Sequence, residues 1–236
     1  MLVLAIDTAT PRVAIALGDG EHVLAEMQLA GGTDRGHGVR RHAELLAPGV
    51  ESLCAQAGVR VPDVSAIAVG IGPGMFTGLR VGVTTAKVLA QALRVPVVPV
   101  PSLDLVAYPL RFTTRVVVAV LDARRREVFA SRYVPVPGGL QRLGDYQVLP
   151  PAELAAELAS GGDELLLAGD GVARYRDEFS VLERAELAGP AFDAPSAIAL
   201  LEIAAGKVIR EEFVALDEVL PMYLRQSDAE IMWERV

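Results

Sequence analysis

The sequence predicts an α/β fold made of two similar halves. Residues 66–100 contain an apolar strand, a glycine-proline turn, a helix and a second apolar strand, which together form a β-α-β unit. Two parallel strands need such a crossover between them. The second observation is a repeat, because LVLAIDTAT and VVVAVLDAR each carry an apolar strand that delivers an aspartate, Asp7 or Asp122, to a hairpin. The repeat indicates a duplicated unit.

The first half opens with strands. Apolar runs at 2–6 and 13–17, separated by turn residues and followed by a further strand at 22–29, predict a three-stranded meander. Apolar residues at helical spacing then predict a helix over 41–57, in which Pro48 should cause a kink.

A helix over 77–93 follows a Gly-Pro-Gly turn. Thr77 is suited to cap its first turn. Small residues share one face of this helix, which lets another backbone approach closely. Two interpretations stay open, because such a face suits either the helix's own sheet or a helix of another protein. These small residues are Gly78, Gly82, Ala86 and Ala90.

The second half is expected to continue as alternating strands and helices. A helix over 196–209 is the last regular element, and its return to the first half stays open. An ordered extension from Asp217 onward ends the chain and carries its only tryptophan, Trp233. The remaining expected elements are strands at 116–121, 127–134 and 164–168, a helix over 151–159 and a tight turn at 169–171.

The composition restricts the class of function. A net charge of −8 opposes a broad nucleic-acid surface, because such surfaces use lysine and arginine to neutralise phosphates. If RNA is involved, we expect a partner to hold it. Cys54 is the only cysteine, so a reducing, cytoplasmic location is expected. The start MLVLAI does not resemble a signal peptide, and no apolar run is long enough to suggest a membrane span.

Strand-end aspartates and a Gly-Asp-Gly turn are residue types that surround nucleotides, since carboxylates hold magnesium and glycines admit phosphates. This interpretation would make the chain an ATP-dependent phosphotransferase. However, Ala9 and Arg124 stand where phosphate loops of the actin, sugar-kinase and heat-shock ATPase type have glycine. The alternative is that both aspartates close turns. The candidate nucleotide residues are Asp7, Thr8, Thr10, Asp122, Gly169 and Gly171.

Other chemistries find less support. The histidines at 22, 37 and 42 do not have the spacing of a zinc-binding pair on one helix, and His42 is expected to be a polar residue at a helix start. Ser102 has no histidine nearby in sequence and is better interpreted as a helix cap. The cluster Arg124-Arg125-Arg126 suits either a phosphate contact or a solvated hairpin tip.

Six blocks along the chain carry a family resemblance. They are LAIDTAT, RRHAELLAPGVESL, VGIGPGMFTGLRVGVTTAKVLA, VPVVPVPSLDLVA, VLDARRREVFA and PMYLR. In combination they resemble the bacterial TsaB family, also called YeaZ, over nearly the whole length. The resemblance implies an actin-like (ASKHA, ribonuclease H-like) two-lobed fold with mixed sheets flanked by helices. That expectation agrees with the duplicated unit.

The resemblance also implies a function. TsaB is the non-catalytic scaffold subunit that activates the transferase TsaD in forming N6-threonylcarbamoyladenosine at tRNA position 37, and the ATPase TsaE joins the pair. The His-x-x-x-His metal pair of TsaD falls here on Ser102 and Val106, which implies that this chain has neither metal nor catalytic residues. A structural ATP or ADP with magnesium is the one cofactor left open, and tRNA would be met only through the complex.

The implied interface involves the N-terminal lobe, residues 1–104, rather than the C-terminal lobe, residues 105–236. Its helices 41–57 and 77–93 would dock TsaD, and the same surface should form homodimers when the chain is alone. A metallopeptidase, the third interpretation, finds no plausible site in the three histidines. The expected interface residues are His42, Leu45, Leu46, Val50, Leu53, Phe76, Thr77, Gly78, Val81, Gly82, Thr85, Ala86 and Leu89.

Overall fold

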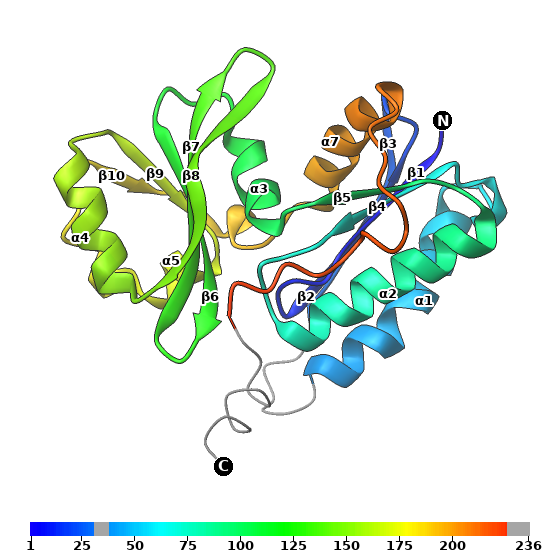
Figure 1. The fold of residues 1–236 in the computed structure, drawn as a ribbon, viewed down its shortest axis with the longest axis horizontal. Helices are drawn as coiled ribbons and strands as arrows, with labels where there is room; N and C mark the ends of the chain where they lie inside the picture. Colours follow the sequence, from blue (N-terminus) through cyan, green and yellow to red (C-terminus); the bar gives the residue numbers. More distant parts are fainter. Residues whose placement is uncertain (31–37, 226–236) are drawn as a thin grey trace.

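Two lobes stand side by side in the computed structural model, which describes residues 1–30 and 38–225 (Figure 1). Each lobe is built on one five-stranded mixed sheet. The first sheet has the order β3-β2-β1-β4-β5, with β1 antiparallel to β2 and parallel to β4. Its strands are β1 (Val3–Asp7), β2 (Arg12–Gly18), β3 (Val23–Ala30), β4 (Ala66–Gly70) and β5 (Val97–Val100).

The second sheet repeats this topology. Its order is β10-β9-β6-β7-β8, and β6, the counterpart of β1, is antiparallel to β7 and parallel to β9. The duplication expected from the two strand-aspartate segments is therefore confirmed. The strands are β6 (Val116–Arg124), β7 (Glu127–Val136), β8 (Gly139–Leu149), β9 (Leu165–Ala168) and β10 (Ala185–Leu187).

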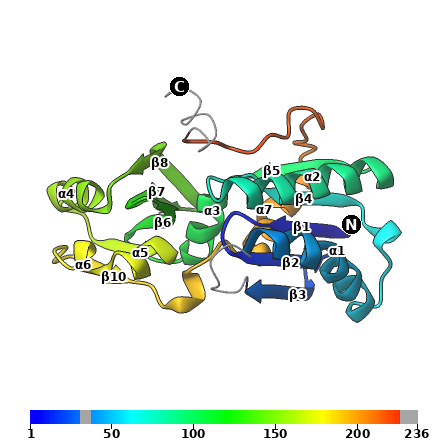
Figure 2. The same cartoon turned by 90° about the horizontal axis from the view of Figure 1, so that it is seen from below.

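Helices cover both faces of the first sheet (Figure 2). Helices α1 (Gly38–Gln56) and α2 (Phe76–Leu93) pack on one face with Leu4 and Ile6. Helix α7 (Ala197–Ile209) packs on the other face with Val3 and Ala5. Because successive strand residues point to opposite faces, a fully apolar β1 serves both cores.

One face of each sheet is covered by a helix from the other half of the chain. Helix α3 (Ser102–Ala107) follows β5, yet Leu103 and Val106 belong to the core under the second sheet. In return, α7 follows the second sheet and covers the first. The other face of the second sheet carries α4 (Pro151–Gly161), α5 (Asp170–Arg174) and α6 (Arg176–Phe179), and short 3-10 turns lie at Val61–Asp63, Tyr108–Leu110 and Pro190–Phe192.

The segment after α7 runs back across both lobes. Val214 forms a bridge with Val97, and Val219 is fully buried in the first lobe. The Met222 N–H donates to the Ile71 carbonyl at 2.7 Å, and Arg225 reaches the second lobe. The expected extension from Asp217 is thus packed as far as it is described, whereas Trp233 lies outside the described residues.

Several elements differ from expectation. Strands β8 and β10 and the short helices α5 and α6 were not predicted, and α1 begins at Gly38 rather than at residue 41. The reason is clearest for β8, an edge strand whose residues are mostly exposed or half-buried, so its sequence has no apolar alternation to detect.

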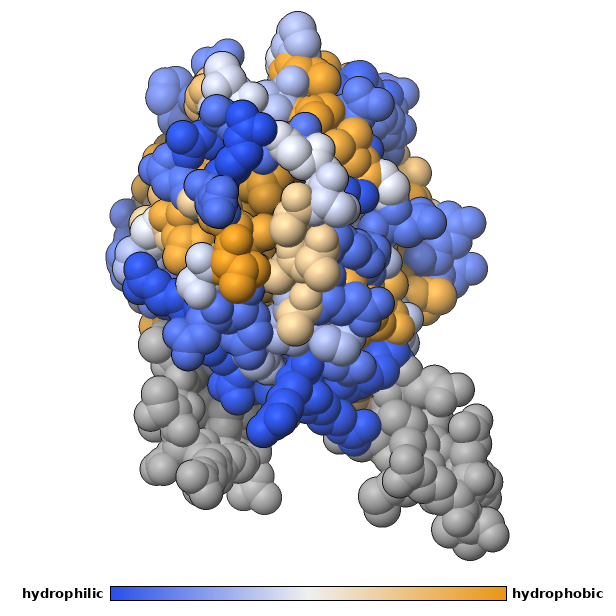
Figure 3. Space-filling view, turned by 90° about the vertical axis from the view of Figure 1, so that its left-hand side faces the viewer, coloured by the Kyte–Doolittle hydropathy of each residue, from blue (hydrophilic) through white to orange (hydrophobic). Residues whose placement is uncertain are grey.

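The outer end of the second lobe, away from the first, shows an apolar area among hydrophilic residues (Figure 3). A pocket of about 190 Å³ lies on this lobe between α4 and the segment after α6, where Leu158 and Leu182 meet Arg184. Across residues 1–30 and 38–225, no helix is both long and apolar enough to cross a membrane.

Candidate functional site

Asp7 ends β1 inside the protein. Only 1% of the residue is exposed, and both carboxylate oxygens accept hydrogen bonds, Oδ1 from the Ala9 N–H at 2.9 Å and Oδ2 from the Ser102 hydroxyl at 2.7 Å. Burial raises the pKa of Asp7, and these hydrogen bonds oppose the shift. A Cβ on Gly70 would lie 1.8 Å from Oδ2, so the neighbouring strand leaves no space there. The carboxylate is enclosed by its own lobe.

Ser102 connects this carboxylate to the Gly-Pro-Gly turn. Its hydroxyl accepts from the Gly72 N–H at 3.1 Å, and its own N–H donates to the Gly72 carbonyl at 2.7 Å. Ser102 is the first residue of α3 and its side chain makes no capping bond, so the expected role as helix cap is wrong. The short apolar strand β5 places it opposite Asp7 instead.

The two threonines after Asp7 are also occupied. The Thr8 hydroxyl donates to the Gly78 carbonyl at 2.8 Å, and the Thr10 hydroxyl accepts from the Arg12 N–H at 3.3 Å. Both residues are buried, Thr8 completely. The turn thus ties β1 to the start of α2.

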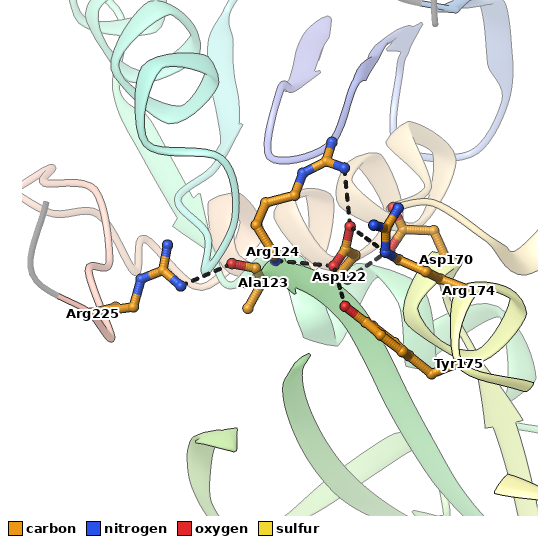
Figure 4. A network of polar contacts seen from close by, with 7 residues as sticks. All are labelled: Asp122, Ala123, Arg124, Asp170, Arg174, Tyr175 and Arg225. Carbon is orange, nitrogen blue, oxygen red and sulfur yellow. Dashed lines mark hydrogen bonds and ion pairs between the residues drawn. The ribbon is translucent and has the colours of Figure 1, made fainter. Parts of the chain in front are cut away.

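Asp122 lies two residues before the end of β6, beside the corresponding turn of the second lobe (Figure 4). Its carboxylate accepts from the Arg124 N–H at 3.0 Å, and it lies 3.1 Å from the Arg124 guanidinium and 3.4 Å from that of Arg174. The Tyr175 hydroxyl donates to it at 3.3 Å. The Asp122 side chain is 6% exposed, so its charge is neutralised locally.

Asp170 and its flanking glycines, Gly169 and Gly171, pack against β6 beside this turn. Asp170 Oδ1 accepts from the Asp122 N–H at 2.9 Å, and burial raises the pKa of Asp170. Gly169 has φ 111°, and a Cβ there would lie 2.0 Å from the Val120 carbonyl oxygen. A Cβ on Gly171 would meet Val120 as well. These glycines permit close packing on β6 rather than an open phosphate loop.

The six candidate nucleotide residues therefore do not fit a magnesium nucleotide in this arrangement. Mg²⁺ requires carboxylate oxygens that it can reach, with near-octahedral geometry. Both carboxylate oxygens of Asp7 already accept hydrogen bonds inside the lobe. At Asp122, two guanidinium groups occupy the position that a metal ion would need. The geometry favours the alternative interpretation, in which both aspartates close turns.

The small-residue face of α2 packs inside its own lobe. A Cβ on Gly78 would lie 2.3 Å from the Thr8 carbonyl oxygen, and one on Gly82 would lie 2.2 Å from the Thr8 hydroxyl oxygen. Ala86 and Ala90 belong to the core with α1. This corrects the expectation that Gly78, Gly82 and Ala86 face a partner, because their small size is needed by the β1 turn and the core beneath.

The same correction applies to part of α1. Leu46, Val50 and Leu53 are buried in the core, and His42 is fully buried, with Nε2 donating to the Pro11 carbonyl at 3.1 Å. Burial also corrects the expectation that His42 belongs to the partner interface, although it lies near the start of α1 as expected. The remaining predicted interface residues keep exposed area on the lobe surface: Leu45, Phe76, Thr77, Val81, Thr85 and Leu89.

An aromatic group closes the N-terminal end of α2. The rings of Phe76 and Tyr223 stack with centroids 4.7 Å apart, and the Arg80 guanidinium lies 3.9 Å from the Phe76 centroid. Arg80 Nε also donates to the Tyr223 hydroxyl at 3.1 Å. The C-terminal segment therefore forms part of the surface at this end, which no sequence pattern indicated.

The two positions at which the family resemblance implied a lost metal pair carry other roles. Ser102 bonds Asp7, and Val106 is buried in the core of the second lobe. Within the described residues no group of three or more histidine, cysteine, aspartate or glutamate side chains could hold a metal ion, and His37 lies outside them.

A second polar group was missed by the sequence. Asp104 accepts from the Tyr133 and Tyr146 hydroxyls at 2.7 and 2.9 Å, at a cleft of about 380 Å³ between α7 and the β7–β8 hairpin. Burial raises the pKa of Asp104, and burial with the Asp104 charge raises the pKa of both tyrosines. These residues come from three separate elements, so only the fold brings them together.

The chain is similar to known proteins over nearly its whole length. The family model of TsaD, tRNA N6-adenosine threonylcarbamoyltransferase, matches residues 23–233. The chain is 31% identical to the tRNA threonylcarbamoyladenosine biosynthesis protein TsaB of Bacillus subtilis over 237 residues, which cover 99% of the chain and 98% of that protein.

Solved structures agree. YeaZ from Pseudomonas aeruginosa has a TM-score of 0.78 at 32% identity, with 94% of this chain and 99% of that chain covered. Component A of the (R)-2-hydroxyglutaryl-CoA dehydratase of Acidaminococcus fermentans has a TM-score of 0.50 at 12% identity, covering 89% and 99%, which is a likeness of fold alone. The expected actin-like, two-lobed fold is confirmed. The chain belongs to the family that the matching model describes, with the TsaB, or YeaZ, proteins as its full-length relatives.

Proposed function

We propose that this chain is a non-catalytic scaffold subunit in the formation of N6-threonylcarbamoyladenosine at tRNA position 37, where it binds and activates a TsaD-like transferase. The full-length similarity to TsaB proteins carries the proposal. The enclosed Asp7–Ser102 pair supports it, because the candidate nucleotide ligand Asp7 and the position of the implied metal ligand, Ser102, bind each other inside the protein. The transferase would supply catalysis, with a TsaE-like ATPase as a third component in the cytoplasm.

The partner would dock on the outer face of α2. Thr77 is exposed, and Val81 and Thr85 are half-exposed one and two turns later on the same face. Val88, next along this side, is 59% exposed. A face of this kind suits helix-to-helix contact, and it would also support the homodimer expected when the chain is alone.

The test is reconstitution with the TsaD-like partner, the ATPase and tRNA. We expect co-purification with the partner and modification that depends on this chain. A partner that modifies tRNA at full rate by itself, or that does not co-purify, would show the scaffold role to be wrong.

Matched variants locate the interface. Thr77→Arg should weaken co-purification and modification together, while the melting temperature stays unchanged, because the residue is exposed. Thr114→Arg, the same substitution at an exposed position preceding β6, should leave both unchanged. Equal behaviour of the two variants would exclude α2 as the docking helix. Light scattering at micromolar concentrations tests the homodimer, and a strictly monomeric chain would contradict it.

The proposal assigns no resident nucleotide to this chain, because Asp7 is buried and Asp122 is paired with two arginines. Calorimetric titration with Mg-ATP tests that point. Stoichiometric binding and turnover that Asp7→Asn abolishes would favour the phosphotransferase instead.

A further inference from the structure

A cleft of about 380 Å³ opens between the two lobes beside α3. Helix α7, which covers the first sheet, forms one wall, and the β7–β8 hairpin of the second lobe forms the other. The tip of this hairpin lies at the end of the second sheet opposite to the end of β6 (Figure 1). The cleft is therefore separate from the Asp122 turn, and its volume falls in the range of small-molecule sites, about 300–1,000 Å³.

The walls of the cleft offer apolar and aromatic surface from both lobes. Ile203 of α7, Leu140 of the hairpin and the ring of Tyr108 line it, and all three residues are half-buried. A Cβ on Gly139 would lie 4.0 Å from the Tyr108 ring, so the hairpin tip comes close to this ring across the cleft. Walls of this kind suit the apolar part of a small molecule.

Asp104 of α3 places a carboxylate at the cleft. Its Oδ1 atom accepts from the hydroxyls of both Tyr133 and Tyr146, whereas Oδ2 accepts no hydrogen bond from the residues that the structure describes. Two donors on one oxygen favour the ionised form of the carboxylate and oppose the rise in its pKa that burial causes. The cleft thus contains an anionic acceptor with one oxygen still unused.

Two cations at the cleft are also without a partner. The Arg142 guanidinium lies 4.0 Å from the centroid of the Tyr146 ring, and Lys207 is half-buried on α7. Within residues 1–30 and 38–225, neither side chain forms an ion pair or a hydrogen bond. Both charges lower the pKa of Asp104, so both cations lie within electrostatic range of its carboxylate.

The other charged groups of the cleft neutralise one another. Glu202 binds Arg111 at 2.7 Å, and Arg210 binds Glu212. Lys207 also acts on the charge of Glu212, but that carboxylate already holds Arg210. The unused groups are therefore one carboxylate oxygen and two cations, which lie next to apolar walls.

We propose that this cleft binds a small zwitterion, an α-amino acid with an apolar or aromatic side chain. Its ammonium group would donate to Asp104 Oδ2, and its carboxylate would accept from Arg142 and Lys207. The side chain would lie against the apolar walls. A simple anion would meet the charge of Asp104 and a simple amine would meet the two cations, so a molecule with both charges is favoured over either. The inference does not depend on the proposed function, which uses none of these residues.

Calorimetric titration of the full chain with L-phenylalanine and L-leucine tests this inference. At least one of them should bind saturably, with one molecule per chain. The analogues that lack the amino group, hydrocinnamate and isocaproate, should bind about tenfold more weakly or worse, because each loses a charged hydrogen bond. The same holds for phenethylamine and isoamylamine, which lack the carboxylate. The proposal is wrong if neither amino acid binds saturably, or if either kind of analogue binds as tightly as its parent amino acid.

Matched variants locate the site. Arg142→Gln and Lys207→Gln should each weaken amino-acid binding several-fold, with little change in melting temperature, because neither side chain has an ion pair to lose within the described residues. Arg176→Gln is the control, since Arg176 is another exposed arginine of the second lobe and lies outside the cleft. It should bind like the wild type.

Asp104→Asn tests the other end of the ligand. The amide keeps the size of the side chain and removes its charge, so binding of the amino acid should weaken while binding of the analogue without an amino group should not. Circular dichroism shows whether this variant is folded, and the comparison of ligands on the wild type needs no variant. If Arg142→Gln and Lys207→Gln both bind like Arg176→Gln, the amino acid does not occupy this cleft and the proposal is overturned.

Discussion

The Ser102 hydroxyl donates a hydrogen bond of 2.7 Å to Asp7 Oδ2 across a sequence separation of 95 residues. The sequence suggested separate chemistries for these positions, because Asp7 was a candidate nucleotide ligand and the family resemblance implied a lost metal ligand at Ser102. In the structure they satisfy each other. The pair joins β1 to α3 at the junction of the lobes, so its expected contribution is to stability.

The first prediction concerns pH. Burial raises the pKa of Asp7 above its ordinary value of 3.8, so the folded state holds this proton more tightly than the unfolded chain does. The stability that this group contributes is complete below pH 3.8 and is lost as pH rises through the folded-state pKa. Asp7→Asn does not titrate. Its free energy of unfolding, relative to that of the wild type, should therefore increase from pH 4 upward.

Urea denaturation at several pH values between about 4 and 8 measures this difference. A tenfold difference in proton affinity between the two states corresponds to about 1.4 kcal/mol. A constant difference between Asp7→Asn and the wild type over the whole range would show that Asp7 has the same pKa folded and unfolded.

Ser102→Ala should destabilise the protein at neutral pH. The variant leaves Asp7 Oδ2 without its donor and the Gly72 N–H without its acceptor, both in a buried position. A buried polar group that loses its partner costs about 1–3 kcal/mol. Ser160→Ala is a control on an exposed helix end, where the hydroxyl donates only to the Glu157 carbonyl. Equal midpoints in urea for the two variants would contradict the prediction.

Elements with strong local sequence signals could be predicted from the sequence, whereas groups that depend on long-range contacts could not. Helix α7 was predictable because its apolar spacing is regular and Ser196 caps it by accepting from the Ala199 N–H at 3.1 Å. Strand β8 was not, because its side chains are largely exposed. The Asp104 cluster depends on Tyr133 and Tyr146, which only the pairing of two later strands places beside α3.

The small face of α2 illustrates the same limit. Its pattern of glycine and alanine showed that something approaches closely, yet the sequence could not identify the approaching group. In the structure that group is Thr8, whose carbonyl and hydroxyl oxygens lie beside Gly78 and Gly82. The sequence identifies Thr8 only as a turn residue, and its contact with α2 is visible only in the folded structure.

Gly82→Ala should therefore destabilise the first lobe. The new Cβ would lie 2.2 Å from the Thr8 hydroxyl oxygen, so either β1 or α2 must shift. Overpacking of this kind costs about 1–3 kcal/mol, more than the gain of about 0.5–1 kcal/mol from replacing a helical glycine. Thermal unfolding should show a melting temperature several degrees lower.

Gly206→Ala in α7 is the matched control for this substitution. Its Cβ would meet only the Arg210 guanidinium, at 3.3 Å, and that flexible side chain can move. The melting temperature should stay the same or rise. If both glycine variants raise it, the close approach of Thr8 to α2 is not essential to the fold.

The last prediction concerns the C-terminal segment. Tyr223→Ala removes the ring that stacks on Phe76 and the hydroxyl that accepts from Arg80. Aromatic pairs contribute about 0.5–1.5 kcal/mol, so local opening of residues 222–225 should increase while the buried Val219 stays protected. Hydrogen exchange resolves the two regions. Tyr223→Phe keeps the stack and loses only the bond from Arg80 Nε, so it should show most of the native protection. If residues 222–225 exchange equally fast in both variants, the hydrogen bond from Arg80, and not the aromatic stack, holds this segment in place.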